Sequence, residues 1–276
     1  MTSIERRPAL LQLGETPGKA QRILARGQNF VVEHMIDDGT GHFGFASATE
    51  SILLLPTAAV RLSGDLTADL PRRSIVIVPA GAYEMRLVEA GDLYLLSTDR
   101  LDIDDRQELN ADMYADPDPR VRPVGPPFKR AGTSEDIRIY PVEQIPIPPD
   151  NGRLRFLQSE TMSLNWVEYS GTRGRDALSP HAHDDFEQAS LAIEGDFVHH
   201  LRTPWGRNAD LWREDEHVPA GAGSITIIPP HIIHTTEGVG DGLHILVDIF
   251  APPRRDFIAK NWIFNARDYA DPMEAA

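Results

Sequence analysis

Short apolar runs rich in β-branched residues recur along this chain, and they constrain its fold more than any other feature. Glycine, proline or aspartate separates the runs. Such runs between turn residues are typical of strands, whereas helices need longer apolar stripes with a period near 3.6. The sequence therefore predicts an all-β sandwich or barrel. The expected strands lie near residues 30–36, 51–55, 74–78, 93–97, 154–157, 162–167, 190–193, 224–228 and 244–250.

Prolines crowd residues 116–150, between two strand-rich blocks. Proline cannot donate to a β-ladder and stiffens an extended chain, so this segment is suited to connecting domains. We therefore predict an N-terminal domain over residues 1–115, a proline-rich connector over 116–150 and a C-terminal domain over 151–276. Two β-rich blocks around one connector also indicate a duplicated domain.

The acidic balance of the chain excludes several kinds of partner. Its 276 residues carry a formal net charge of -15, which repels phosphate backbones and argues against nucleic acid. No apolar run approaches the roughly 18 residues that span a bilayer, and no apolar signal region follows the first residues. Cysteine is absent, which excludes disulfides and thiolate ligands. We therefore expect a cytoplasmic protein that acts on a small molecule, with no nucleic-acid or membrane partner.

Histidines at two separate places in the second block predict a metal site. His181 and His183 are two positions apart, so on a strand their side chains point to the same face. Glu187 or Gln188 follows as an oxygen donor, and His234 comes from a later strand. Three imidazoles and one side-chain oxygen suit a divalent ion and leave coordination positions open. The sequence thus predicts one bound ion, and these ligand types allow Fe, Mn, Ni, Zn or Co.

The first histidine segment resembles the first motif of the cupins, G-x5-H-x-H-x(3,4)-E-x6-G. His181 and His183 take the two histidine positions, Gln188 follows after four residues, and Gly195 follows after six more. Family spacing puts Gln188 at the position of the acidic ligand. Because some cupins with this sequence use the glutamine, the resemblance favours Gln188 as a ligand, with Glu187 as the alternative.

The second histidine segment is similar to the other cupin motif, G-x5-P-x-G-x2-H-x3-N. Gly223, Pro229 and His234 match this motif, whereas His231 replaces the motif glycine. Together the two motifs cover about residues 174–255. The resemblance implies that this block is a double-stranded β-helix, or jelly-roll, barrel with His234 among its metal ligands.

The first block resembles a decayed copy of the same unit. Residues 73–84 repeat the second motif with Pro79 and Gly81 in place, but Glu84 stands where the metal histidine should be. Upstream, no pair of histidines falls in register. We therefore predict two cupin barrels in one chain, a bicupin, whose N-terminal barrel holds no metal. The decayed barrel would serve as the intramolecular partner of the active one, and the formation of homo-oligomers stays open.

A finer resemblance lies after the second motif. Asp248, Phe250 and Arg254, in the pattern D-x-F-x-P-P-R, are similar to the tail of small cupins of pectin and alginate breakdown that open unsaturated uronate rings. In those proteins these positions lie near the metal pocket. The resemblance implies that Asp248 acts as a general acid or base and that Arg254 binds a substrate carboxylate.

Three functions fit these features. The first is a metal-dependent enzyme that acts without redox change on a small oxygenated carboxylate, such as a sugar acid, by isomerisation, tautomerisation or ring opening. The second is a non-haem Fe(II) dioxygenase, because three histidines and one weak oxygen ligand also suit iron. The third is a non-catalytic protein that binds a small ligand in its barrel. Gln188 and the tail favour the first function.

Overall fold

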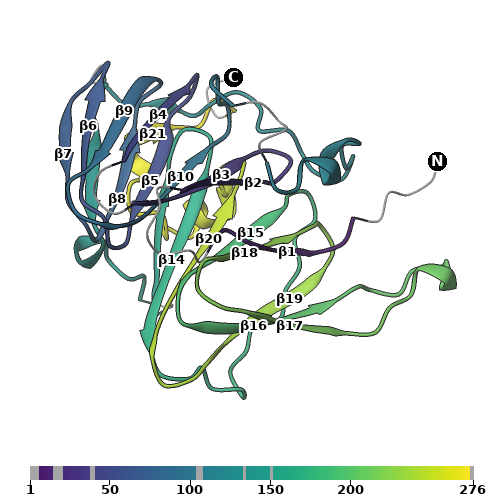
Figure 1. Ribbon diagram of the computed structural model, residues 1–276. Coiled ribbons are helices and arrows are strands. Elements are labelled where there is room, and N and C mark those ends of the chain that lie inside the picture. The colour runs from purple at the N-terminus through teal and green to yellow at the C-terminus, as the bar shows by residue number, and fades with distance from the viewer. Residues whose placement is uncertain are drawn as a thin grey trace.

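Strands dominate the computed structural model, which describes residues 6–14, 21–37, 41–103, 108–132, 135–149 and 152–273 (Figure 1). The predicted all-β class is confirmed. Among these residues the only α-helix is α1 (Arg255–Ala259). The described 3-10 turns are η2 (Ala111–Tyr114), η3 (Val142–Gln144), η4 (Ala209–Leu211) and η5 (Ala266–Asp268). No helix in the described ranges is long and apolar enough to cross a membrane.

The N-terminal half contains two antiparallel sheets that pack face to face. The six-stranded sheet has the order β12-β8-β5-β10-β3-β2, and the four-stranded sheet has the order β4-β9-β6-β7. The bounds are β2 (Gln21–Arg26), β3 (Val31–Asp37), β4 (His42–Ser47), β5 (Ser51–Leu55), β6 (Val60–Gly64), β7 (Ala68–Leu70), β8 (Ser74–Val78), β9 (Gly81–Leu87), β10 (Gly91–Ser97) and β12 (Arg138–Pro141).

The C-terminal half has a similar pair of sheets. Its six-stranded sheet has the order β1-β18-β15-β20-β14-β13, and its three-stranded sheet has the order β17-β16-β19. A short pair, β11 and β21, stands apart. The bounds are β1 (Ala9–Gln12), β11 (Lys129–Arg130), β13 (Leu154–Gln158), β14 (Ser163–Ser170), β15 (Gln188–Glu194), β16 (Asp196–Arg202), β17 (Glu216–Ala220), β18 (Ser224–Ile228), β19 (Ile233–Val239), β20 (Leu243–Phe250) and β21 (Tyr269–Ala270).

Strand pairing crosses the predicted domain boundaries in both directions. β1, near the start of the chain, pairs with β18 and so extends the sheet of the C-terminal half. β12, which lies within the predicted connector 116–150, pairs with β8 and extends the sheet of the N-terminal half. The division into 1–115, 116–150 and 151–276 remains a prediction, but each half borrows an edge strand from outside its own segment.

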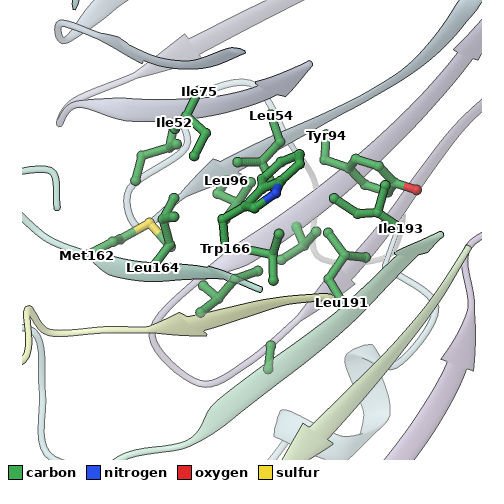
Figure 2. Close-up of a cluster of buried hydrophobic side chains, with 14 of the residues drawn as sticks. Ile52, Leu54, Ile75, Tyr94, Leu96, Met162, Leu164, Trp166, Leu191 and Ile193 are labelled. Carbon is green, nitrogen blue, oxygen red and sulfur yellow. The ribbon is translucent and has the colours of Figure 1, made fainter. Parts of the chain in front are cut away.

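The largest core lies between the two six-stranded sheets. β5 and β8 are buried at every residue because they pack on both faces. One face of each meets the four-stranded sheet, and the other meets the C-terminal half. This two-sided burial explains their unbroken apolar sequence, whereas the outer strand β9 alternates between buried and exposed residues. Figure 2 shows the side chains of this inter-sheet core around Trp166.

Replacing Trp166 with alanine should lower the free energy of unfolding by about 3–5 kcal/mol, because the change leaves a large cavity between the sheets. Trp166 is 0% exposed, and its indole Nε1 donates to the Glu168 carboxylate at 2.8 Å. Leu101→Ala is the matched control, since Leu101 is 67% exposed. Urea unfolding that finds Trp166→Ala as stable as this control would show that the halves do not depend on this packing.

Candidate metal centre

The segment that carries His181 and His183 is extended, but it is not a regular strand. His181 and His234 form an isolated antiparallel bridge, with N–O distances of 3.0 and 2.8 Å. The amide of His231 also donates to the carbonyl of His183 at 2.7 Å. The prediction that this segment is a strand is therefore wrong. Main-chain hydrogen bonds to His231 and to His234, at the start of β19, hold the segment in place instead. His231 has a φ of 71°, which agrees with the glycine at this position of the cupin motif.

The fold brings the three predicted imidazoles together. One ring nitrogen from each of His181, His183 and His234 lies within 4.8 Å of the others. Gln188, the first residue of β15, completes the set: its Oε1 lies 2.9 Å from Nε2 of His183 and 3.3 Å from Nε2 of His234. Two ligands across an ion with bonds of about 2.1 Å are about 4.2 Å apart. The imidazole nitrogens are thus close enough to face one ion, and they would draw closer together on binding it.

The hydrogen bonds behind the rings assign their tautomers. His181 Nδ1 lies 2.9 Å from the carbonyl of Ser179, and His234 Nδ1 lies 2.9 Å from the carbonyl of Ile232. A carbonyl only accepts, so both Nδ1 atoms carry a proton, and in the neutral form of each ring Nε2 keeps a lone pair. Burial, more than any neighbouring charge, lowers the pKa of His234 to about 4. At neutral pH the ring of His234 is therefore uncharged, as a metal ligand must be.

The orientation of Gln188 is also fixed. Its amide nitrogen donates to Asp248 Oδ1 at 3.0 Å and to Ser190 Oγ at 3.0 Å. A carboxylate only accepts, so the carbonyl oxygen Oε1 must face the imidazoles. This oxygen and the lone pair of His234 Nε2 are both acceptors, yet they lie 3.3 Å apart. Two acceptors that face each other with no proton between them fit a cation, and this donor set therefore fits a divalent metal.

Glu187 lies away from this group, because neighbouring side chains on a strand point to opposite faces. Its Oε2 accepts from the amide of Gln28 at 2.6 Å, and its Oε1 accepts from Arg6 at 3.4 Å and from the hydroxyl of Tyr114 at 3.3 Å. Glu187 is 1% exposed. Its carboxylate thus hydrogen-bonds to residues of the N-terminal half of the chain and does not face the imidazoles.

Asp248, on β20, stands directly behind Gln188. Its Oδ1 accepts from Ser190 at 2.7 Å as well as from Gln188, whereas its Oδ2 accepts from Asn165 at 3.3 Å. Antiparallel register places Ser190 and Asn165 on either side of it. Burial raises the pKa of Asp248, although these hydrogen bonds and the nearby His181 oppose the shift. The predicted acid or base thus lies one hydrogen bond from a predicted ligand.

A cavity of about 420 Å³ opens onto the imidazoles, Gln188 and Asp248. This volume lies in the range of small-molecule sites. Aromatic rings form one wall and include Phe156, Phe250, Phe257 and Trp262. Four cationic side chains also line the cavity, namely Arg153, Arg173, Arg254 and Lys260. The sequence did not single out Arg173 or Lys260, because neither belongs to a motif and only the folded chain brings them to the cavity.

Arg254 reaches the cavity with part of its guanidinium already engaged. Its Nε and Nη2 donate to the carboxylate of Asp256, at 2.7 Å each, and the guanidinium lies over the rings of Phe257 and Phe186 at 4.1 and 4.5 Å. Its Nη1 is buried and has no hydrogen-bond partner among the described residues. Asp256 therefore orients the side chain, and Nη1 remains for a ligand.

In the N-terminal half, the position that corresponds to His234 is an exposed glutamate and not a buried histidine. Glu84 is exposed on β9, while Phe43, Phe45, Tyr83 and Met85 fill the space between the sheets. The rings of Phe45 and Tyr83 stack at 5.3 Å. That this half holds no metal remains a prediction, and a filled apolar interior is consistent with it.

His199, which is not one of the proposed metal ligands, gives the protein a pH-dependent stability. It is 0% exposed, and burial first, then His234 and His200, lower its pKa to about 4. An unfolded histidine titrates near 6.5, so acid favours the unfolded chain. The neutral form of His199 therefore stabilises the folded protein above pH 6.5. As the pH falls from 6.5 toward 4, His199 lowers the free energy of unfolding by about 1.4 kcal/mol for each pH unit.

His199→Asn should remove this contribution while keeping a polar atom beside Thr236, to which His199 Nδ1 lies at 2.9 Å. We expect urea unfolding at pH 7 and pH 5 to give a smaller difference in the variant than in the wild type. The same difference in both proteins would contradict this role of His199.

No family model matches the sequence, and no curated protein matches it. Solved structures do match. AerE from Microcystis aeruginosa has a TM-score of 0.56 and 10% identity, covering 88% of this chain and 96% of AerE. A variant of oxalate decarboxylase OxdC from Bacillus subtilis has a TM-score of 0.56 and 15% identity, covering 88% of this chain and 77% of its own.

The formate complex of oxalate decarboxylase from Lactobacillus farciminis is also similar, with a TM-score of 0.57 and 12% identity, covering 89% of this chain and 86% of the enzyme. Another structure of the Bacillus enzyme concerns its Mn(II) centres and has a TM-score of 0.54 and 11% identity. At such low identity these likenesses show the fold alone.

Proposed function

We propose that the C-terminal half binds one divalent metal through His181, His183, His234 and Oε1 of Gln188. On this site the protein would act, without redox change, on a small oxygenated carboxylate such as a sugar acid. The observation that carries the proposal is the pair of facing acceptors, His234 Nε2 and Gln188 Oε1, 3.3 Å apart at the edge of a cavity. A cation between them satisfies both at once.

Each sandwich of sheets is, in this proposal, one cupin barrel, and the two form an intramolecular pair. The N-terminal barrel supports the active one, and the substrate is a small molecule, without nucleic-acid or membrane partners. The likeness to oxalate decarboxylase, whose name refers to a small carboxylate, supports this substrate class. Fe, Mn, Ni, Zn and Co all suit three imidazoles and one amide oxygen. Cytoplasmic location and homo-oligomers remain predictions.

A divalent ion held by His181, His183, His234 and Gln188 would supply Lewis-acid chemistry, by lowering the pKa of a substrate hydroxyl and stabilising negative charge on oxygen. The protein supplies proton transfer and orientation. Asp248 Oδ1 already accepts two hydrogen bonds, so Oδ2, which accepts one, is the oxygen that can take up a proton. Arg254 Nη1 donates to the substrate carboxylate, and the aromatic wall on which this guanidinium stacks keeps water away from it.

Ring opening of a cyclic sugar acid illustrates these roles. Asp248 removes the proton from the anomeric hydroxyl, the bond between the anomeric carbon and the ring oxygen breaks as the carbonyl forms, and the protonated Asp248 returns the proton to the ring oxygen. Arg254 holds the carboxylate throughout, so the reacting carbon stays beside Asp248. Isomerisation and tautomerisation use the same proton transfer between neighbouring atoms.

The experiment is a substrate panel on protein fully loaded with Mn(II), Zn(II) or Fe(II). Unsaturated uronates and related keto-sugars are incubated with the protein and followed by proton NMR, with oxygen uptake recorded in parallel. Conversion without oxygen uptake is the expected result. Oxygen consumption with the iron form would instead support the dioxygenase. If none of these compounds is converted by protein that holds one ion per chain, the proposed reaction is rejected, and a protein that only binds a small ligand remains.

A further inference from the structure

Two arginines that lie side by side face the cavity at the end away from Arg254. Arg153 precedes β13, and Arg173 follows β14; both line the cavity and both are half-buried. The guanidinium of Arg153 lies 5.7 Å from the ring centre of Tyr169. Arg173 is close enough to Arg153 for the two charges to repel, and burial together with this repulsion lowers the pKa of Arg173.

Neither arginine has a carboxylate partner among the residues that the structure describes. Arg173 donates to neutral acceptors: Nη1 to the carbonyl of Thr236 at 2.6 Å, and Nη2 to Ala177 and Ser179 at 3.2 Å. Its Nε is buried without a partner. Arg254, by contrast, is neutralised by Asp256. Asp248 is the carboxylate that acts on Arg173 through space, but it forms no ion pair with it, and two adjacent cations without an ion-pair partner are a costly arrangement unless an anion binds there.

The strand register places this pair at a defined position relative to the metal site. Tyr169 pairs with His244, Asn165 with Asp248, and Ser163 with Phe250. The amide of Arg254 donates to Ser163 at 2.9 Å. Arg153 and Arg173 thus lie at the Tyr169 end of the strands and Arg254 lies at the Ser163 end, roughly 20 Å apart along the backbone, with Asp248 between them. All three arginines nevertheless line the same cavity.

We propose that Arg153 and Arg173 form a second anion subsite, so that the substrate carries a carboxylate at each end, as an aldaric acid does. This inference rests on the proposed function and narrows its substrate class. Arg254 holds the first carboxylate, the proposed ion and Asp248 face the middle of the molecule, and the arginine pair holds the second carboxylate. Arginine suits this role because its planar fork pairs with both oxygens of a carboxylate.

Two six-carbon sugar acids test the inference, because galactarate and galactonate differ only in the second terminal carboxylate. Isothermal titration on the Mn(II)-loaded protein should show that galactarate binds at least about 10-fold more tightly, since the second carboxylate gains charge-assisted hydrogen bonds. The double variant Arg153→Gln/Arg173→Gln should lose this preference and bind both acids as the wild type binds galactonate. Arg153→Lys/Arg173→Lys keeps the charge and should recover part of the preference.

Arg175→Gln is the control for net charge, because Arg175 is 77% exposed and lies outside this cavity. It should keep the preference for galactarate. Equal affinity of the wild type for the two acids would overturn the second subsite and leave the metal site intact. If neither acid binds to protein that holds Mn(II), the subsite and the proposed substrate class both fail. If Mn(II) itself does not bind, the proposed function fails at its first step.

Discussion

His183→Ala should weaken the binding of a divalent metal by at least about 100-fold, because it removes a ligand, and even residues that only support ligands contribute 10- to 100-fold. His183 is 9% exposed, its Nε2 lies 2.9 Å from Gln188 Oε1, and burial first, then the neighbouring His234, lower its pKa to about 3. The imidazole is thus neutral and held in place, and the change to alanine creates no new charge. Titration with Mn(II) or Co(II) measures the affinity.

The control for this prediction removes a histidine that lies nearby but outside the ligand group. His231→Gly suits the backbone, since His231 has a positive φ of 71° that glycine adopts without strain. This variant should bind the metal as the wild type does. If His183→Ala binds as tightly as His231→Gly, the three imidazoles do not act together on one ion.

Asp248→Asn should reduce the turnover of a substrate identified in the panel by about 10²- to 10⁴-fold, the usual contribution of a general acid or base. Asparagine has nearly the same shape, but its amide does not exchange a proton near neutral pH. Metal content should remain close to one ion per chain, because Asp248 hydrogen-bonds to Gln188 and is not itself one of the proposed ligands.

Ser190→Ala separates proton transfer from positioning. Ser190 donates to the same oxygen of Asp248 at 2.7 Å, so its loss leaves the carboxylate in place with one hydrogen bond fewer. This variant should shift the pH profile of turnover to higher pH, since the hydroxyl stabilises the charged form, with a much smaller loss of rate. Equal losses in Ser190→Ala and Asp248→Asn would assign Asp248 a structural role.

The sequence predicts much of this architecture because its strongest signals are local. Short β-branched runs indicate the strands, and the spacing of His181, His183 and His234 indicates the residues that converge. β1 could not be predicted, because residues 9–12 have no periodic pattern and gain their structure by pairing with β18. Arg173 is a similar case, since the folded chain alone brings it to the cavity.

Gln188 and Glu187 show where sequence reasoning reaches its limit. Both carry a side-chain oxygen at a suitable distance along the chain, and only the partners behind them separate the two. Asp248 and Ser190 turn Gln188 toward the imidazoles, whereas Arg6, Gln28 and Tyr114 hold Glu187 on the other face. The N-terminal part of the chain thereby fixes the residue next to a proposed ligand, which gives the N-terminal half a role in positioning the site.

X-ray absorption spectroscopy of the Mn(II)- or Zn(II)-loaded wild type tests the central claim most directly, because it reports the atoms around the ion without knowledge of the substrate. We expect an inner shell of nitrogen and oxygen at about 2.0–2.2 Å, with the outer-shell scattering of three imidazole rings. A shell made of oxygen alone, with no imidazole scattering, would contradict a metal centre built from His181, His183 and His234.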